Sequence, residues 1–230
     1  MTFWIIAIGT MALSLWAAAR VKRVYRKYSE LPVRSGLTGA EAADRILRAA
    51  GIRDVEIVEH EEMLGDHYDP MKKQLVLSRD NYHGSSPAAL GVAAHECGHA
   101  LQHAQAYAPL QWRMAAVGAT TFASQIVMWL PILGIFTGLI APMTGAAIMA
   151  AAWGVIMLFN LVTLPVEFDA SRRAKAVLLR MNMVNSQEER EGVEKVLNAA
   201  ALTYVAAFIT SLAYLLWHLL PLLAGGRDRE

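Results

Sequence analysis

Four long apolar segments constrain this chain more than any other feature of its sequence. They cover residues 3–19, 114–139, 146–164 and 199–223, and none of them contains Asp, Glu, Lys or Arg. Charged residues make up only 18% of the 230 positions, whereas about a quarter is usual for a soluble domain. A chain that crosses lipid must satisfy its backbone polar groups internally, so each segment is predicted to be a transmembrane helix.

Basic residues beside these segments predict the direction in which the chain crosses the membrane. They follow the first segment as Arg20, Lys22, Arg23, Arg26 and Lys27, and the third as Arg172, Arg173, Lys175 and Arg180. The turn at 141–145 contains neither Lys nor Arg. The positive-inside rule therefore predicts both termini outside, with 20–110 and 167–198 in the cytoplasm. No basic residue precedes the first segment, which favours an anchor over a cleaved signal peptide.

The remaining sequence predicts a small α+β cytoplasmic domain in a mainly α membrane protein. A capping box at 38–41 and a glycine at position 51 delimit a helix, while 55–59 and 75–78 have the pattern of strands around a turn at 65–74. The predicted organisation is a transmembrane helix at 1–19, a cytoplasmic helix, sheet and helix at 20–110, a transmembrane hairpin at 111–166, cytoplasmic helices at 167–198, a fourth transmembrane helix at 199–223 and a tail at 224–230.

The sequence Ala-His-Glu-Cys-Gly-His-Ala at 94–100 has the H-E-x-x-H spacing of a zinc site carried on one helix. Ser86 as N-cap and a following proline predict a helix over 87–104. His95 and His99 would share one face of it, each about 2 Å from a common ion. Glu96 could then reach a water on that ion as a general base. The alternative is a pair of histidines on a solvated helix face.

Two histidines leave a catalytic His₂Glu zinc site one protein ligand short. Glu167 is the best candidate for the third ligand, because a carboxylate so close to the end of a span is costly without a partner. Asp169 is the second choice, and Asp66 or Asp69 the third. Small neighbours would allow the Glu167 helix to pack close to the histidine helix; they are Ala170, Ser171 and Ala174.

Several polar residues are candidates for binding substrate or stabilising the oxyanion of a reaction at this site. They are His67, Tyr68 and Asp69 in the predicted turn, and Arg172 and Arg173 after Glu167. An ordinary Asx-type turn with a solvated histidine is the alternative for 67–69. The single cysteine, Cys97, is predicted to be buried packing that points away from the histidines. His103 is about 12 Å along the helix from His95 and is predicted not to share the ion.

Three stretches resemble the bacterial neutral zinc metallopeptidase family of integral membrane proteins, the YugP-like group. They are Gly-Asp-His-Tyr-Asp-Pro at 65–70, Ala-Ala-His-Glu-Cys-Gly-His-Ala-Leu-Gln at 93–102 and Leu-Pro-Val-Glu-Phe-Asp-Ala-Ser-Arg-Arg at 164–173. The chain is more distantly similar to HtpX-related membrane proteases and CAAX prenyl proteases. The resemblance implies a gluzincin-type peptidase with one Zn²⁺, held by His95, His99 and Glu167, and with Glu96 as base. The HtpX-like group has an aspartate four residues after the glutamate ligand, where this chain has Ser171.

The predicted function is that of a zinc metalloprotease in the bacterial plasma membrane. It would hydrolyse peptide bonds of membrane-associated or membrane-adjacent proteins on the cytoplasmic side, with Glu96 activating a zinc-bound water. A net charge of +1 and the lack of a basic stripe give no support to nucleic-acid binding. The alternative is a membrane scaffold that binds zinc without proteolysis. A zinc transporter would need more polar residues in its spans than Gln125 and Asn160.

Overall fold

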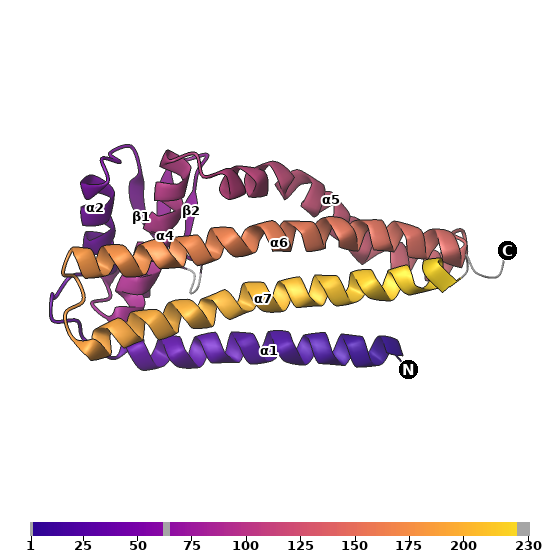
Figure 1. Ribbon diagram of the computed structural model, residues 1–230, viewed down its shortest axis with the longest axis horizontal. Helices are drawn as coiled ribbons and strands as arrows, with labels where there is room; N and C mark the ends of the chain where they lie inside the picture. Colours follow the sequence, from indigo (N-terminus) through magenta and orange to yellow (C-terminus); the bar gives the residue numbers. More distant parts are fainter. Residues whose placement is uncertain (1, 62–64, 225–230) are drawn as a thin grey trace. The chain divides into compact units, whose positions relative to one another are not determined.

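The computed structural model describes residues 2–61 and 65–224 and is mainly helical (Figure 1). The predicted tail lies, from residue 225 onward, outside the described residues. The helices are α1 (Thr2–Ser29), α2 (Gly39–Ala49), α3 (Arg79–His83), α4 (Pro87–Ala104), α5 (Ala108–Thr137), α6 (Pro142–Arg180) and α7 (Gln187–Ala224), and the strands are β1 (Glu56–His60), β2 (His67–Asp69) and β3 (Gln74–Ser78).

The chain folds into two compact units, and the helices α1, α5, α6 and α7 each contribute residues to both. The unit called here the helical unit consists of Met1–Trp16, Trp112–Leu164 and Thr203–Glu230. The other, called the mixed unit, consists of Ala17–Gln111 and Pro165–Leu202 and contains all three strands. In α6 the boundary between the units falls at Pro165, where proline removes one hydrogen bond from the helix ladder.

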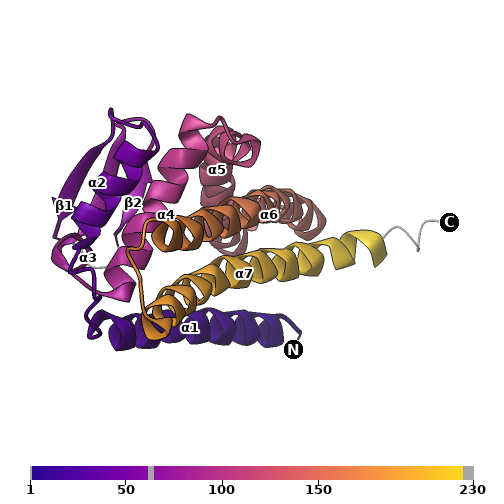
Figure 2. The same cartoon turned by 60° about the vertical axis from the view of Figure 1, so that its left-hand side comes forward.

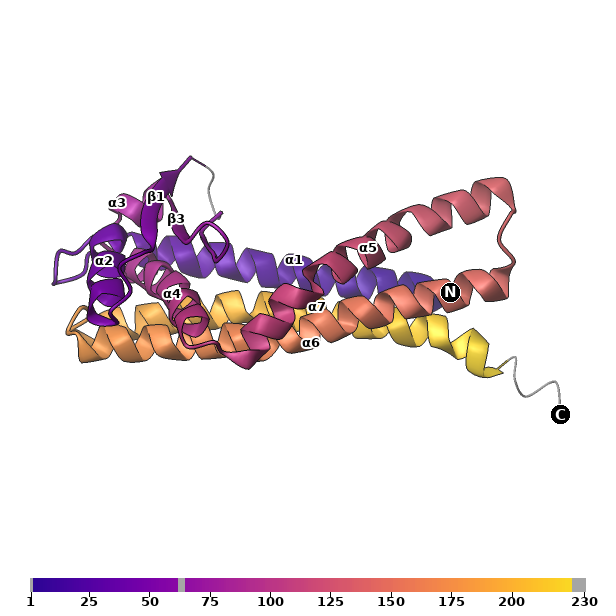
Figure 3. The same cartoon turned by 90° about the horizontal axis from the view of Figure 1, so that it is seen from above.

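The helical unit contains most of each apolar segment that was predicted to span the membrane. Helices α1, α5, α6 and α7 are each long and apolar enough to cross a bilayer, which agrees with the four predicted crossings. Helices α5 and α6 are antiparallel and joined by a short turn at 138–141 (Figure 3). In this unit, the Trp153 ring on α6 stacks on that of Tyr214 on α7 with 4.6 Å between centroids, and Asn160 donates to Ser211.

These helices extend beyond the apolar segments from which they were predicted. Helix α1 continues to Ser29, ten residues after the predicted end at 19, and α7 begins at Gln187, twelve residues before the apolar run. Residues 20–28 contain neither Gly nor Pro, so nothing in this basic stretch interrupts the helix. Helices α1 and α7 therefore each have an apolar section and a charged section.

The mixed unit is built on a three-stranded sheet in the order β1-β3-β2. Strands β1 and β3 are parallel, and β2 pairs with β3 as an antiparallel hairpin. The sequence predicted a turn throughout 65–74, and this was wrong for 67–69, which form β2. The turn itself is confined to 70–73, where Asp69 accepts hydrogen bonds from the amides of Met71 and Lys72. This local bonding leaves the three preceding residues free to pair with β3.

Helices α2 and α4 pack on each other and on the sheet, and together they form the core of the mixed unit (Figure 2). The predicted capping box of α2 is confirmed, because Thr38 and Glu41 exchange hydrogen bonds, and Gly51 after the helix has a φ of +75°. Buried residues from both helices, the sheet, α6 and α7 meet in one cluster that includes Ile46, Leu75, Leu90 and Leu178. Helix α4 is thus surrounded on most sides, as a rigid support for a site should be.

Candidate metal centre

Helix α4 carries the H-E-x-x-H sequence and has the bounds that its capping residues predicted. Ser86 is the N-cap and accepts a hydrogen bond from the Ala89 amide at 3.1 Å, and Pro87 occupies the first turn. Leu90, Ala94 and Cys97 are all 0% exposed and face the core. This buried face fixes the rotation of α4 about its axis and so decides where the two histidines point.

A close approach of α4 and α6 brings the third side chain of the site into place. A Cβ added at Gly98 would lie 2.8 Å from the carbonyl oxygen of Ala170 and 3.0 Å from its Cα. Only glycine leaves room for backbone atoms at this separation. Ala170 and Ala174 are 0% exposed, which confirms that small residues on α6 allow tight packing against the histidine helix.

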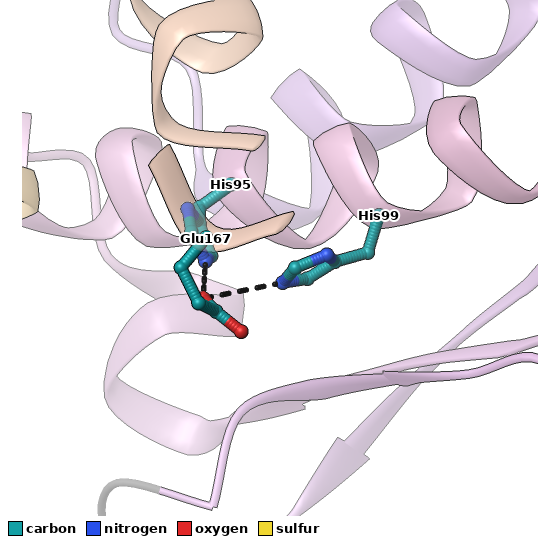
Figure 4. A group of neighbouring side chains, drawn as sticks. All are labelled: His95, His99 and Glu167. Carbon is teal, nitrogen blue, oxygen red and sulfur yellow. Dashed lines mark hydrogen bonds and ion pairs between the residues drawn. The ribbon is translucent and has the colours of Figure 1, made fainter. Parts of the chain in front are cut away.

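His95, His99 and Glu167 form one cluster across these two helices (Figure 4). The Nε2 atoms of His95 and His99 lie 3.1 and 3.6 Å from Oε2 of Glu167, and the potential ligand atoms all lie within 4.8 Å of one another. Glu167 is 2% exposed, and both histidines are largely buried. Burial lowers the pKa of His99, but the neighbouring carboxylates of Glu167 and Glu96 together outweigh this and raise it above its usual value.

The cluster fits a zinc ion by donor type and by spacing. Donor atoms 2.0–2.1 Å from a tetrahedral ion lie about 3.3 Å from one another. The observed Nε2-to-oxygen distances of 3.1 and 3.6 Å bracket that value. Two imidazole nitrogens and one carboxylate oxygen are also the usual ligands of a catalytic zinc. Two of the three donor separations are therefore close to those of a zinc site, and the third is at most 4.8 Å.

Each histidine also makes a hydrogen bond through its other ring nitrogen. Nδ1 of His95 lies 3.1 Å from the Ser171 hydroxyl, and Nδ1 of His99 lies 3.0 Å from Oε1 of Gln102. Ser171 thus occupies the position four residues after Glu167 and contacts a histidine there, although it is a hydroxyl rather than a carboxylate. Such contacts orient metal-binding imidazoles before the ion arrives.

Glu96 and Cys97 follow His95 and have different surroundings. Glu96 is 7% exposed, and no other described side chain makes a hydrogen bond or ion pair with its carboxylate. Cys97 is fully buried, and this burial raises the pKa of its thiol well above the usual value. The cysteine is therefore an inert packing residue, as the sequence predicted.

The other carboxylates considered as third ligands are committed elsewhere in the mixed unit. Asp169 is 5% exposed and accepts a hydrogen bond from Gln102. Asp66 accepts from the Ser78 amide at 2.7 Å and from the Asn81 side chain at 2.9 Å, and so ties the start of β2 to β3 and α3. Among the described residues, Glu167 is the carboxylate that joins the two histidines.

The residues 67–69 have three separate roles in the structure. His67 is exposed, with Nδ1 2.7 Å from the Gly65 carbonyl. The Tyr68 hydroxyl lies 2.9 Å from Nδ1 of His103, and burial raises the pKa of this phenol. Backbone hydrogen bonds from Lys72, and less strongly from Met71, lower the pKa of the Asp69 carboxyl. Asp69 therefore has the Asx-turn role that was considered as an alternative.

Arg172 and Arg173 both bind the carboxylate of Asp169. Arg172 leaves most of its side chain exposed, while Arg173 also donates to Gln105 at 2.6 Å and lies over the ring of Tyr107. Sequence reasoning considered these two arginines only as direct contacts to substrate. The structure adds that they neutralise a buried carboxylate two residues after Glu167.

Gln102 is the residue near the site that sequence reasoning missed. It is 0% exposed, and its amide connects His99 with Val166 and Asp169 of α6. Its spacing of three from His99 would have placed it on the same helix face. A glutamine in a helix is common, however, and its partners on α6 are more than sixty positions away.

Comparison with known proteins identifies a family and a relative of this chain. A family model described as "Putative neutral zinc metallopeptidase" matches residues 3–223. The chain belongs to this family. A protein of Bacillus subtilis (strain 168) named "Putative membrane protease YugP" is 42% identical over 231 residues, which cover 100% of both chains. No solved structure matches the chain. The resemblance predicted from the three stretches is thus confirmed, and four apolar helices with a membrane-protease relative indicate membrane association.

The contact at Gly98 leads to a first testable prediction. We expect Gly98→Ala to reduce the free energy of unfolding by about 1–3 kcal/mol, because the new methyl group forces α4 and α6 apart. Separation of these helices also moves Glu167 away from the histidines, so zinc affinity should fall. Unfolding midpoints and chelator-competition titrations of the purified protein in detergent measure the two effects.

Gly91→Ala on the same helix is the matched control. Its added Cβ would lie 3.6 Å from Val193, an ordinary contact. Replacing glycine by alanine inside a helix should then be neutral or stabilise by about 0.5–1 kcal/mol. Equal behaviour of the two variants would contradict the role assigned to the close approach.

Proposed function

We propose that this protein is a membrane-embedded zinc metallopeptidase with a gluzincin-like active site. The observation that carries the proposal is the cluster of two Nε2 atoms and one carboxylate oxygen, all within 4.8 Å, from His95, His99 and Glu167. A small sheet packs beside the helix that carries both imidazoles, and a second helix provides the carboxylate. Membership of a zinc metallopeptidase family supports the same assignment.

The number of ligands favours catalysis over a purely structural role for zinc. Structural zinc sites usually have four protein ligands, and thiolates are common among them. Among the described residues, the cluster has three candidate ligands, and the chain's one cysteine is buried away from them. The fourth position would then be open to water or substrate. A non-proteolytic zinc scaffold remains the second candidate function, and the experiments below separate the two.

Glu96 is the proposed general base. When bound, zinc would act as a Lewis acid and lower the pKa of a coordinated water toward about 7. Glu96 takes a proton from the attacking water and passes it to the nitrogen of the leaving amine. Its position directly after His95, and the lack of any bond to another described side chain, leave the carboxylate free for this transfer.

Tyr68 is the proposed donor to the oxyanion that develops on the scissile carbonyl. Among the other candidates, Arg172 and Arg173 are held by Asp169, and His67 bonds to the backbone at Gly65. Strand β2 packs against α4, and the raised pKa of Tyr68 keeps its phenol protonated. A phenol both donates and accepts hydrogen bonds. If His103 donates to it from Nδ1, the Tyr68 proton is available to the oxyanion.

The proposed substrates are membrane-associated or membrane-adjacent proteins on the cytoplasmic side. Glu167 lies on α6, the same continuous helix whose preceding residues are apolar enough to cross a bilayer. The basic residues after the first and third apolar segments support a cytoplasmic location for 20–110 and 167–198 and an outer location for both termini. One zinc ion per chain is expected from the single cluster in the described part of the chain.

The most direct test of catalysis is the substitution Glu96→Gln. We expect this variant to bind zinc as tightly as the wild type but to cleave peptide bonds about 10²- to 10⁴-fold more slowly, because the general base is lost. Glu167→Gln should instead lower zinc affinity itself. Zinc content and cleavage rates of the purified protein in lipid measure both results.

Two controls define what would contradict this proposal. If the wild type cleaves no peptide bond and Glu96→Gln binds zinc as the wild type does, the scaffold function is favoured. A single peptide sequence is assayed both free and attached to a membrane anchor, in the same lipid. Equal cleavage of the two forms would contradict a preference for membrane-associated substrates.

The role of Tyr68 is tested by Tyr68→Phe. Removal of one oxyanion donor should lower kcat by about 10²- to 10³-fold, with KM and zinc affinity nearly unchanged. Tyr82→Phe, on the neighbouring helix α3, is the matched control and should retain full activity. A normal kcat in Tyr68→Phe would show that another residue stabilises the oxyanion.

The predicted topology is tested with single cysteines and a membrane-impermeant maleimide. A cysteine at Thr144 should be labelled in intact cells, and one at Lys72 only after the membrane is permeabilised. Both positions are exposed in the structure. The native Cys97 should stay unlabelled in either case, because it is buried and its thiol is protonated. The opposite labelling pattern would place the active site outside the cytoplasm.

A further inference from the structure

Gln102 occupies a position in which its side-chain amide can have only one orientation. It is 0% exposed and lies one helical turn after His99 on α4. Its Nε2 is 2.8 Å from the carbonyl oxygen of Val166 and 3.0 Å from Oδ2 of Asp169. Both of these atoms are acceptors, so the NH₂ group of the amide must face them.

The orientation of the amide decides which nitrogen of His99 carries a proton. With its NH₂ group committed to α6, Gln102 presents Oε1 to Nδ1 of His99 at 3.0 Å. A carbonyl oxygen can only accept, so this Nδ1 must be protonated. In the neutral ring, Nε2 is then the bare nitrogen, and it faces Glu167 at a distance of 3.6 Å.

Asp169 keeps Gln102 in this arrangement. Its carboxylate is 5% exposed and is neutralised by Arg172 and Arg173. Arg173 also lies over the ring of Tyr107. A charged carboxylate is a strong acceptor and holds the Gln102 NH₂ group more firmly than a neutral group would.

The corresponding contact of His95 lacks this property. Its Nδ1 lies 3.1 Å from the hydroxyl of Ser171. A hydroxyl rotates and can either donate or accept, so Ser171 is compatible with both tautomers of His95. The two histidines of the cluster therefore differ, because only His99 has a partner that dictates its tautomer.

We propose that Gln102 is a positioning residue that keeps Nδ1 of His99 protonated and its Nε2 available to a metal ion, while Asp169 fixes Gln102. This inference rests on the proposed function insofar as the metal is zinc. The protonation of Nδ1 itself follows from hydrogen bonds within the chain and does not require zinc. A site with one imidazole already in the required tautomer should bind the ion more tightly than a site with two unconstrained ones.

The proposal is tested in the full-length protein with Gln102→Met, Gln102→Glu and, as a control, Gln105→Met. Methionine has a similar length but no acceptor oxygen for Nδ1, whereas glutamate retains one. Gln105 contacts Arg173 but not the histidines. Histidine ring nitrogens are followed by ¹⁵N NMR with and without Zn²⁺, and zinc affinity is measured by chelator competition.

We expect Nδ1 of His99 to be protonated in the wild type with or without zinc. Gln102→Met should lower zinc affinity about 10- to 100-fold and remove the preference for the Nδ1-protonated ring. Gln102→Glu should keep Nδ1 of His99 protonated, although its carboxylate is repelled by Asp169, and Gln105→Met should behave as wild type.

Two results would overturn the proposal. One is an unprotonated Nδ1, or zinc bound through Nδ1, at His99 in the wild type, and this test does not depend on whether any variant folds. The other is a folded Gln102→Met protein with wild-type zinc affinity and an unchanged His99 tautomer. A wild type that binds no zinc but has a protonated Nδ1 would instead count against the proposed function alone.

Discussion

Backbone contact between α4 and α6 at Gly98 and Ala170 is the constraint on which the site depends. The two helices approach so closely that a single methyl group would meet a carbonyl oxygen at 2.8 Å. This separation lets Glu167 reach two imidazoles that are held rigidly on α4. A carboxylate that is 2% exposed is costly to bury, and its hydrogen bond with His95 offsets part of that cost. The close packing of α4 on α6 therefore determines whether Glu167 can lie beside the two histidines.

The polar groups around the cluster are arranged so that few are left without a partner. Gln102 connects the histidine helix to α6, and Asp169 is satisfied by that amide and by two arginines. Ser171 completes the set at His95. A connected network of this kind is stable when buried, because its donors and acceptors pair with one another. It also holds the imidazoles in place, which a metal site requires.

Apolar sequence and a residue of the proposed zinc site lie on one element, α6. Its first part is an apolar helix of the helical unit, and its last part, after Pro165, carries Glu167 and the groups that surround it in the mixed unit. Family membership indicates a zinc metallopeptidase, and the four apolar helices indicate membrane association. Their combination on a single helix is the physical reason to expect substrates at or near the membrane surface.

Local sequence determined the features that depend on neighbouring residues. The four apolar segments, the caps of α2 and α4 and the four-residue spacing of His95 and His99 all follow from helical periodicity and composition. Tertiary structure decided which distant groups join them. Glu167 contacts His95 across 72 positions. Asp66 and Asp169 instead bond to residues outside the histidine pair, and Gln102 connects His99 to α6. Which residues pair depends on how closely α4 and α6 pack and on which buried hydrogen-bond donors still need an acceptor. No local pattern encodes them, because each partner lies on a different element.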